Sequence, residues 1–446
     1  MPNSDCQPQP ALEILHPLDR WPPPGVTVVL AIQWLVILVP GVLVLGEVVG
    51  LAWGLDAAAR VEYMQRLLLV SAAAQAAQVL WGHRLPGQVG PSAVLIVGTL
   101  ATISSGPASV AGAMAVGAGL TALAGFSGLA ARLGRLYTPP VLASTLLLVA
   151  MSLTPTMRDL LYSPAAGGGS VSGGFLFGLG LVLVMLLAQY RLKGLWSSAV
   201  LLLGMAVGSL VYYAIGLEPW PAWRGGTLTG LPALFPTGPE FNPGVIAAFV
   251  LCYLALISNE LATIESTGRL IGATGMDGRA NRAVAVAGLG GVAAGLMGSL
   301  GPVTYSVSPA VVISTRSASR YTLLPMAGAV AALALWPGGL SLFSLAPAPV
   351  VGAVLVTLMA QSVYAALHLL LSGGKMPTWA SGATVGVALT AGVIVSFIPE
   401  EARQALHPVI RPILANGFVV GLVLALLLEH VLLRRKREDP APVPRL

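Results

Sequence analysis

Charged side chains are scarce in this chain. Only 9% of its 446 residues are Asp, Glu, Lys or Arg, whereas 56% are hydrophobic, and the mean hydropathy is +0.84. A soluble domain carries about 25% charged residues. A chain of this composition cannot cover itself with a polar surface, so it is predicted to be an integral membrane protein. The 53 glycines fit helices that pack closely in lipid through small residues.

Cysteine is almost absent. Cys6 and Cys252 are the only two, one in the N-terminal tail and one in an apolar segment, so the sequence predicts neither a disulfide framework nor a zinc site. No cluster of metal ligands, nucleophile–base arrangement or phosphate loop is apparent, and we therefore expect no metal, no cofactor and no enzyme activity. The first 24 residues contain no apolar run and do not resemble a signal peptide.

Apolar segments of about 20 residues dominate the rest of the chain and are candidate membrane-spanning helices. We expect an all-α polytopic protein with fourteen of them: 25–50, 63–81, 88–104, 106–127, 138–155, 174–190, 195–217, 243–270, 283–300, 302–317, 321–337, 347–371, 377–398 and 410–433. The expected organisation is a cytoplasmic tail (1–24), a first seven-span repeat (25–217), an external loop (218–242), a second seven-span repeat (243–433) and a basic cytoplasmic tail (434–446).

The basic residues predict the orientation. With the amino terminus inside, 17 of the 23 Lys and Arg fall on cytoplasmic segments. The other six are Arg60, Arg66, Arg158, Arg224, Arg403 and Arg411. This split follows the positive-inside rule and predicts a multi-pass protein of the cytoplasmic membrane with both termini in the cytoplasm. The formal charge of +6 is thus read as an orientation signal, not as a nucleic-acid surface.

A weak internal repeat links the two halves. "GPSAVLIV" at 90–97 is similar to "VSPAVVIS" at 307–314, and "TPPVLASTLLLVAM" at 138–151 is similar to "PAPVVGAVLVTLMA" at 347–360. Each pair lies seven spans apart, so the two halves would enter the membrane in opposite senses, as in many secondary transporters. Chance similarity in a chain rich in Ala, Val and Gly is the alternative.

The third and tenth spans are short and interrupted by proline. Ser308 followed by Pro309 is a good helix start, and Gly90-Pro91 has similar character. Two half-helix amino termini facing each other near the midplane would offer amide donors to a polar ligand. An ordinary proline kink is the alternative reading.

Two glutamates, Glu260 and Glu265, lie in the apolar segment 243–270, where the bilayer makes charge costly. Five residues place them about 140° apart on a helix, so they are not expected to share one site. Glu265 can pair with Arg269, four residues on, or face a ligand or carry a proton in a polar cavity. We expect the second role.

Several segments together resemble the nucleobase–ascorbate transporter family, also called nucleobase–cation symporters. These are "LDRWPPPGVTVVLAIQW" at the first span, "LYTPPVLASTLLLVAMSLTP" at the fifth, "ESTGRLIGATG" at the eighth, "GSLGPVTYSVSPAVVISTRSASRY" at the tenth and "LAPAPVVGAVLVTLMA" at the twelfth. The resemblance extends from about residue 18 to 433.

The resemblance implies a core domain of spans 1–4 and 8–11, a gate domain of spans 5–7 and 12–14, and short strands in spans 3 and 10. It further implies a permease for uracil, xanthine or a related base, symport with a proton (or sodium), and a homodimer through the gate domain. Carried over by position, Glu265 is the main substrate ligand, Ala93, Val307 and Ser308 also line the substrate site, and Gln33, Arg269 and Thr315 support it or the coupling.

Departures from the family pattern keep other functions open. Val307-Ser308 replaces the family's Gln or Glu followed by Asn, Arg269 replaces an Asp or His, the ninth-span Asp falls at Ala287, and Trp34 replaces a His. Arg269 beside half-helix amino termini would also suit a small anion, so an anion transporter on the same fold is one alternative. A membrane receptor that does not transport is another.

Overall fold

The computed structural model describes residues 14–134, 136–163, 171–192, 194–221, 228–236, 238–371, 378–407 and 409–433. The expected basic tail 434–446 and the first thirteen residues of the expected N-terminal tail lie outside these ranges. The first half of the chain contains α1 (Pro24–Ala52), α2 (Ala57–Leu80), β1 (Val89–Pro91), α3 (Ala93–Ala101), η1 (Ile103–Ser105), α4 (Gly106–Phe126), α5 (Ala130–Gly134), α6 (Pro139–Ser152), α7 (Thr154–Leu161), α8 (Val171–Arg191) and α9 (Leu195–Ala214).

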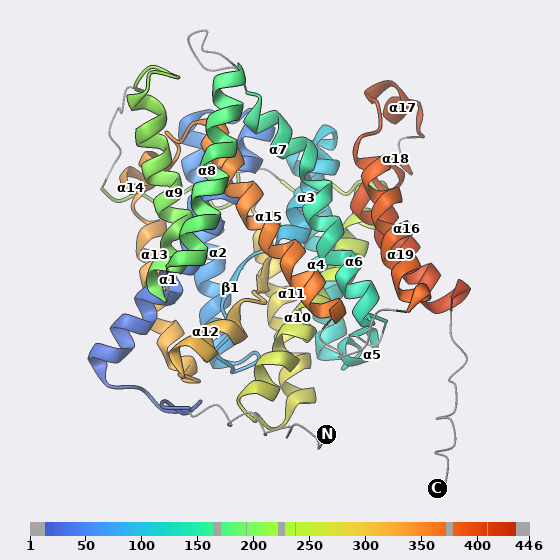
Figure 1. Ribbon diagram of the computed structural model, residues 1–446. Helices are drawn as coiled ribbons and strands as arrows, with labels where there is room; N and C mark the ends of the chain where they lie inside the picture. The colour runs from blue at the N-terminus through green and yellow to red at the C-terminus, as the bar shows by residue number, and fades with distance from the viewer. Residues whose placement is uncertain are drawn as a thin grey trace, which may run out of the picture.

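The second half contains α10 (Pro243–Leu270), α11 (Met276–Leu296), β2 (Pro302–Thr304), α12 (Ser308–Thr315), η2 (Arg320–Thr322), α13 (Leu323–Ala334), α14 (Pro337–Phe343), α15 (Ala348–Leu371), α16 (Trp379–Ser396), α17 (Glu400–Ala405), α18 (Arg411–Leu414), α19 (Gly417–Leu427) and η3 (Leu428–Leu432). The described chain is thus almost entirely helical (Figure 1).

Eight helices in the described residues are long and apolar enough to cross a membrane. A ninth span results if the pair 320–334 and 337–343, bent by 85°, is counted as one. Several further segments, including α2, α11 and α19, are shorter or more polar than this criterion requires. The protein is therefore a multi-pass membrane protein, although the expected fourteen spans exceed the number that length and hydropathy identify.

The strands expected in spans 3 and 10 are confirmed. β1 and β2 pair antiparallel, with Val89 opposite Thr304 and Pro91 opposite Pro302. The ladder continues at both ends, where the Tyr305 amide donates to the Gln88 carbonyl (2.7 Å) and the Ser92 amide donates to the Gly301 carbonyl (3.0 Å). All six strand residues are buried, as non-helical backbone in a membrane must be. A short helix follows each strand, α3 of 9 residues and α12 of 8.

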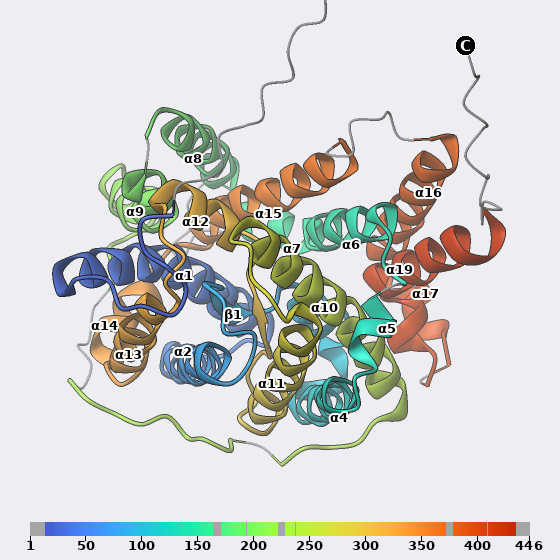
Figure 2. The same ribbon diagram turned by 90° about the horizontal axis from the view of Figure 1, so that it is seen from below.

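The helices form two groups around this strand pair. Seen from below, α1, α2, α4, α10 and α11 surround the strands, whereas α8, α9, α15, α6, α16 and α19 lie to one side of them (Figure 2). In the first group, α4 and α11 approach closely because glycine lies at the contact. A Cβ atom on Gly288 of α11 would overlap the backbone of Ala122, and one on Gly125 of α4 would overlap the backbone of Ala285. This packing holds the strand pair on a rigid frame.

Candidate functional site

A fully buried carboxylate from α10 reaches the strand pair. The Glu260 carboxylate accepts hydrogen bonds from the Thr304 amide (2.7 Å) and the Thr304 hydroxyl (2.6 Å), both at the end of β2. It also accepts a longer bond from the Gln78 side-chain amide of α2 (3.3 Å). The described residues place no cation in an ion pair with it. Glu260 therefore joins α10 to β2 and α2 through neutral donors.

Two glutamines of α2, three residues apart and so on one face of the helix, complete this buried polar network. The side chain of Gln75 accepts from the Val89 amide (2.7 Å) and donates to the Gly87 carbonyl (3.0 Å), bridging the chain where it enters β1. Gln78 donates to the Ala283 carbonyl of α11 (2.9 Å) as well as to Glu260. The network satisfies polar backbone that would otherwise be exposed to an apolar interior.

The two short helices begin at the ends of the paired strands. Neither Ser92, before α3, nor Val307, before α12, caps its helix with a side-chain hydrogen bond. The first amides of a helix lack intrahelical partners, so the start of α3 offers backbone donors to a ligand. At α12 the Ser308 amide already donates to the Tyr305 carbonyl (3.1 Å) and Pro309 has no N–H, which leaves the Ala310 amide. Ala93 is half-buried at the start of α3, and Val307 is 41% exposed at the start of α12. The expected pair of half-helix starts is therefore present.

Ser308 has a structural role in this arrangement. It is fully buried; its hydroxyl donates to the Tyr305 carbonyl (2.6 Å) and accepts from the Gln88 amide (3.0 Å). The first bond closes the turn between β2 and α12, and the second joins this turn to Gln88, the residue before β1. The hydroxyl group of Ser308 is thus already hydrogen-bonded within the protein and is not free to bind a ligand.

An amide and a hydroxyl meet beside the start of α12. The Ser306 hydroxyl donates to the side-chain oxygen of Asn259 on α10 (3.4 Å), and Ser306 is exposed. The NH2 group of Asn259 has no hydrogen-bond partner within the described part of the chain. Asn259 can therefore offer a donor, while the Ser306 hydroxyl can donate or accept. Sequence reasoning missed this pair because neither residue is charged.

The expectation that Glu265 stands unpaired in a buried polar cavity is wrong. Glu265 forms an ion pair with Arg269 along α10, and their side chains are 59% and 78% exposed. On the helix Glu265 lies about 120° from Asn259 and 140° from Glu260. Leu261, one turn before it on the same face, packs against a cluster that includes Ala130 of α5. The structure thus has the pairing that the sequence offered as the alternative.

The remaining predicted site residues are dispersed. Gln33 is half-buried in α1, and no hydrogen bond connects it to the strand pair among the described residues. Thr315 lies at the far end of α12, where its hydroxyl donates to the Val311 carbonyl (2.8 Å). Arg269 is occupied by Glu265. Of the predicted set, Ala93, Val307 and Ser308 lie at the two helix starts.

One sequence signal could have identified Glu260. It lies in the eighteenth position of a 28-residue helix, deep within the span, whereas Glu265 is five residues from the helix end. The cost of a buried carboxylate is therefore greater at Glu260, and a specific set of partners is correspondingly more necessary there. No group of three His, Cys, Asp or Glu able to hold a metal occurs among the residues that the structure describes.

Comparison with known proteins identifies the family of the chain. The model of a family described as "Permease family" matches residues 25–401. A putative purine permease of Bacillus subtilis, YwdJ, is 27% identical over 431 residues, covering 92% of this chain and 96% of that protein. The uric acid permease PucK of the same organism is 25% identical over 438 residues, covering 93% and 97%. The xanthine permease XanQ of Escherichia coli is 24% identical over 310 residues, covering 67% and 66%.

Solved structures with a similar fold include the transmembrane domain of a cyanobacterial bicarbonate transporter, BicA. That chain is 16% identical, with a TM-score of 0.62, and the match covers 83% of this chain and 95% of that one. The murine anion transporter Slc26a9 is 14% identical with a TM-score of 0.57, covering 90% and 67%. At these identities the likeness establishes the fold alone.

Proposed function

The chain belongs to the permease family, whose members are transporters and not enzymes, and from this premise we propose that it carries a nucleobase across the membrane. Xanthine, uric acid and uracil are the candidate substrates. The observation that carries the proposal is the exposed Asn259–Ser306 pair beside the start of α12. The names of the purine, uric acid and xanthine permeases similar to this chain support the substrate class.

The chemistry of a nucleobase suits this set of groups. The rim of a purine or pyrimidine alternates ring NH donors with carbonyl acceptors. The Asn259 side-chain amide, the Ser306 hydroxyl, the first amides of α3 and the Ala310 amide of α12 supply complementary acceptors and donors. Ala93 and Val307 add small apolar walls that accommodate a flat ring without competing for hydrogen bonds. In this proposal Asn259 is the main substrate ligand, the role that the family resemblance assigned to Glu265.

The proposed transport mechanism is alternating access between the two helix groups. In it, fourteen segments cross the membrane in two inverted halves: 25–217 and 243–433. The order of elements supports two related halves. In each half two long helices come first, α1 and α2 or α10 and α11, and a strand with a short helix follows, β1 with α3 or β2 with α12. The group around the strands would be the core and the remaining helices the gate, with a homodimer forming through the gate.

We further propose that a proton drives uptake and that the protein lies in the cytoplasmic membrane with both termini inside. Glu260 supports proton coupling, since a carboxyl group can take up and release a proton and this one contacts the strand that precedes α12. A change in its protonation would alter the bonds to Thr304 close to the proposed site.

The test is uptake into proteoliposomes. With a pH gradient, wild-type protein should accumulate radiolabelled xanthine or uric acid. Asn259→Ala should lower uptake at subsaturating substrate by about 10-fold, the loss expected for one or two hydrogen bonds. Glu265→Gln is the matched control on the same helix and should retain uptake within about two-fold, because an exposed ion pair contributes little.

Three outcomes would contradict the proposal. Loss of uptake in Glu265→Gln with normal uptake in Asn259→Ala would return the ligand role to Glu265. Accumulation of bicarbonate or sulfate with no competition by bases would identify an anion transporter. Base binding without uptake would identify a receptor.

A further inference from the structure

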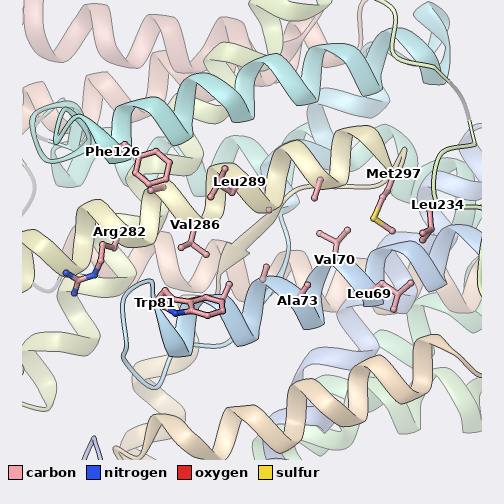
Figure 3. A pocket seen from close by; sticks show the side chains of 15 residues that line it. Leu69, Val70, Ala73, Trp81, Phe126, Leu234, Arg282, Val286, Leu289 and Met297 are labelled. Atoms are coloured by element: carbon pink, nitrogen blue, oxygen red, sulfur yellow. The ribbon is translucent and has the colours of Figure 1, made fainter.

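An apolar groove runs along the outside of the helix group that holds the strand pair. It lies between α2 and α11, has a volume of about 710 Å³ and is lined by 15 residues, of which only Arg282 is charged (Figure 3). Trp81, Phe126 and Leu289 line it although each of these large apolar side chains is more than half exposed. Because the protein is a multi-pass membrane protein, an apolar groove on its outside faces the acyl chains of the bilayer.

The groove is long enough to hold a lipid acyl chain. Arg282 of α11 and Met297, the residue directly after α11, line its two ends and lie fifteen residues apart, which corresponds to about 22 Å of helix. The hydrocarbon core of a bilayer is about 30 Å thick, so one leaflet contributes about 15 Å. An acyl chain that enters at Arg282 would therefore lie within the groove along its whole length.

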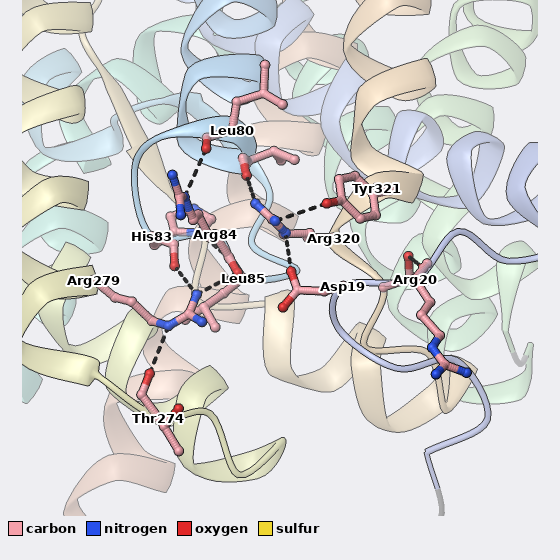
Figure 4. Close-up of polar contacts among 12 residues, drawn as sticks. Asp19, Arg20, Leu80, His83, Arg84, Leu85, Thr274, Arg279, Arg320 and Tyr321 are labelled. Carbon is pink, nitrogen blue, oxygen red and sulfur yellow. Dashed lines mark hydrogen bonds and ion pairs between the residues drawn. The ribbon is translucent and has the colours of Figure 1, made fainter.

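The end of the groove at Arg282 is strongly basic. Arg282 donates through its Nε atom to the Gly82 carbonyl (3.3 Å), and it takes part in none of the ion pairs among the described residues. Arg84, in the loop between α2 and β1, and Arg279, in the first turn of α11, lie close by. Arg84 donates to the Leu80 carbonyl (3.0 Å) and Arg279 to the carbonyls of His83 and Arg84 (2.9 Å each) (Figure 4).

One ion pair offsets part of this basic end, and Asp277 in the first turn of α11 is a second nearby carboxylate. Asp19 pairs with Arg320 (2.8 Å), the fourth arginine of the group, and no other ion pair involves these arginines in the described ranges. The positive charge thus exceeds the negative charge where the apolar groove opens. Arginine forms strong, bidentate hydrogen bonds to phosphate, which makes a phosphodiester the matching group.

We propose that this groove binds an anionic phospholipid, with an acyl chain between α2 and α11 and the phosphodiester at Arg282. The indole of Trp81 lies near the same end, as tryptophan does at the boundary between acyl chains and headgroups. The lipid would stabilise the packing of α2 against α11, where Gln78 of α2 donates both to the Ala283 carbonyl of α11 and to Glu260. The proposal does not depend on the transported substrate.

The test is a thermal-shift measurement on the purified, delipidated full-length protein in detergent. Dioleoyl phosphatidylglycerol should raise Tm by about 2–4 °C, and dioleoyl phosphatidylcholine, with the same chains and no net charge, should raise it by less than half as much. Arg282→Gln should remove the difference between the two lipids. Arg132→Gln, which changes an exposed arginine on α5, is the matched control and should preserve the difference.

A second variant tests the groove itself. Ala73 lines the groove and is exposed, so Ala73→Trp should fit without disturbing the interior and should abolish the shift by both lipids. Arg282→Lys keeps the charge and should keep part of the shift if Arg282→Gln fails to fold.

Each contrary result overturns the proposal. An unchanged phosphatidylglycerol shift in Ala73→Trp would place lipid elsewhere, and an unchanged difference between lipids in Arg282→Gln would exclude this guanidinium as the phosphate ligand. Equal shifts by the two lipids would exclude anionic selectivity. If native mass spectrometry showed a dimer of the wild-type protein and only a monomer of Ala73→Trp, the groove would be an interface between two copies of the protein.

Discussion

The Glu260 carboxylate accepts three hydrogen bonds in a fully buried position, and this makes it the residue on which the strand pair most depends. Its donors, the Thr304 amide and hydroxyl and the Gln78 side chain, come from two other elements. A buried donor that loses its acceptor costs about 1–3 kcal/mol. The same residue type at Glu265 makes one exposed pair.

We therefore expect Glu260→Leu to lower the stability of the protein by several times more than Glu265→Leu. Three donors would lose their acceptor at Glu260, whereas the exposed pair at Glu265 contributes at most about 1 kcal/mol. The measurement is Tm in detergent, followed by intrinsic fluorescence. Equal changes in Tm for the two variants would mean that the Glu260 network does not stabilise the fold.

His83 predicts a dependence of stability on pH. It lies in the loop between α2 and β1, and burial, with help from Arg279 and Arg320, lowers its pKa from 6.5 to about 3 (Figure 4). Above pH 6.5 the imidazole is neutral in both the folded and the unfolded chain. Below pH 6.5 the unfolded chain gains a proton that the folded protein does not, so the free energy of unfolding falls until about pH 3.

At pH 5 this loss should amount to about 2 kcal/mol relative to pH 7. The expected observation is a Tm that falls between pH 7 and pH 5 and falls less in His83→Asn, which retains an acceptor for the Leu85 amide (2.9 Å). A variant with the same pH profile as the wild type would show that another group causes the loss.

Elements were more predictable from the sequence than side-chain directions. Proline and small residues near 90 and 308 predicted two interrupted spans, and the paired strands with short helices confirm them. The directions of Glu260 and Glu265 could not be predicted, because the hydrophobic pattern of the surrounding helix does not distinguish a face toward β2 from a face toward α5. That distinction depends on which helices pack around α10.

The close packing of α4 on α11 predicts that the two helices tolerate no side chain at the glycines of their contact. Gly288→Ala should lower Tm strongly, because its Cβ would overlap the backbone of Ala122, and backbone in a helix pair cannot move independently. Gly382→Ala on α16 is the matched control: no atom lies within 4 Å of its Cβ position, and alanine favours the helix by about 1 kcal/mol over glycine. Similar Tm values for both variants would contradict the packing argument.

At the scale of the whole molecule, composition alone predicted a multi-pass membrane protein, and the resemblance predicted its family. The expected number of spans is not matched by length and hydropathy: α2, which carries Gln75 and Gln78 of the buried network, and α11 are both absent from the eight helices that meet these two criteria. The hydrophobic pattern along the sequence also does not indicate which polar residues of the two halves of the chain contact each other.

The distribution of arginine predicts the orientation, and cysteine labelling tests it. In a Cys6→Ser background, with the buried Cys252 retained, Asp159→Cys should react with an impermeant maleimide on intact cells. Arg132→Cys should react only after the membrane is opened, since α5 lies on the side assigned to the cytoplasm. Labelling in the reverse order would place both termini outside.

The pairing of β1 with β2 also has a consequence for biosynthesis. β2 begins about 210 residues after β1 ends, so at roughly 5–20 residues per second the ribosome needs about 10–40 s to supply the partner strand. During that interval the first strand would have unsatisfied peptide groups in lipid, which is costly. Gln75 belongs to the helix synthesised just before and bonds both Gly87 and Val89. Its carboxamide can therefore hydrogen-bond the backbone at the start of β1 before β2 has been synthesised.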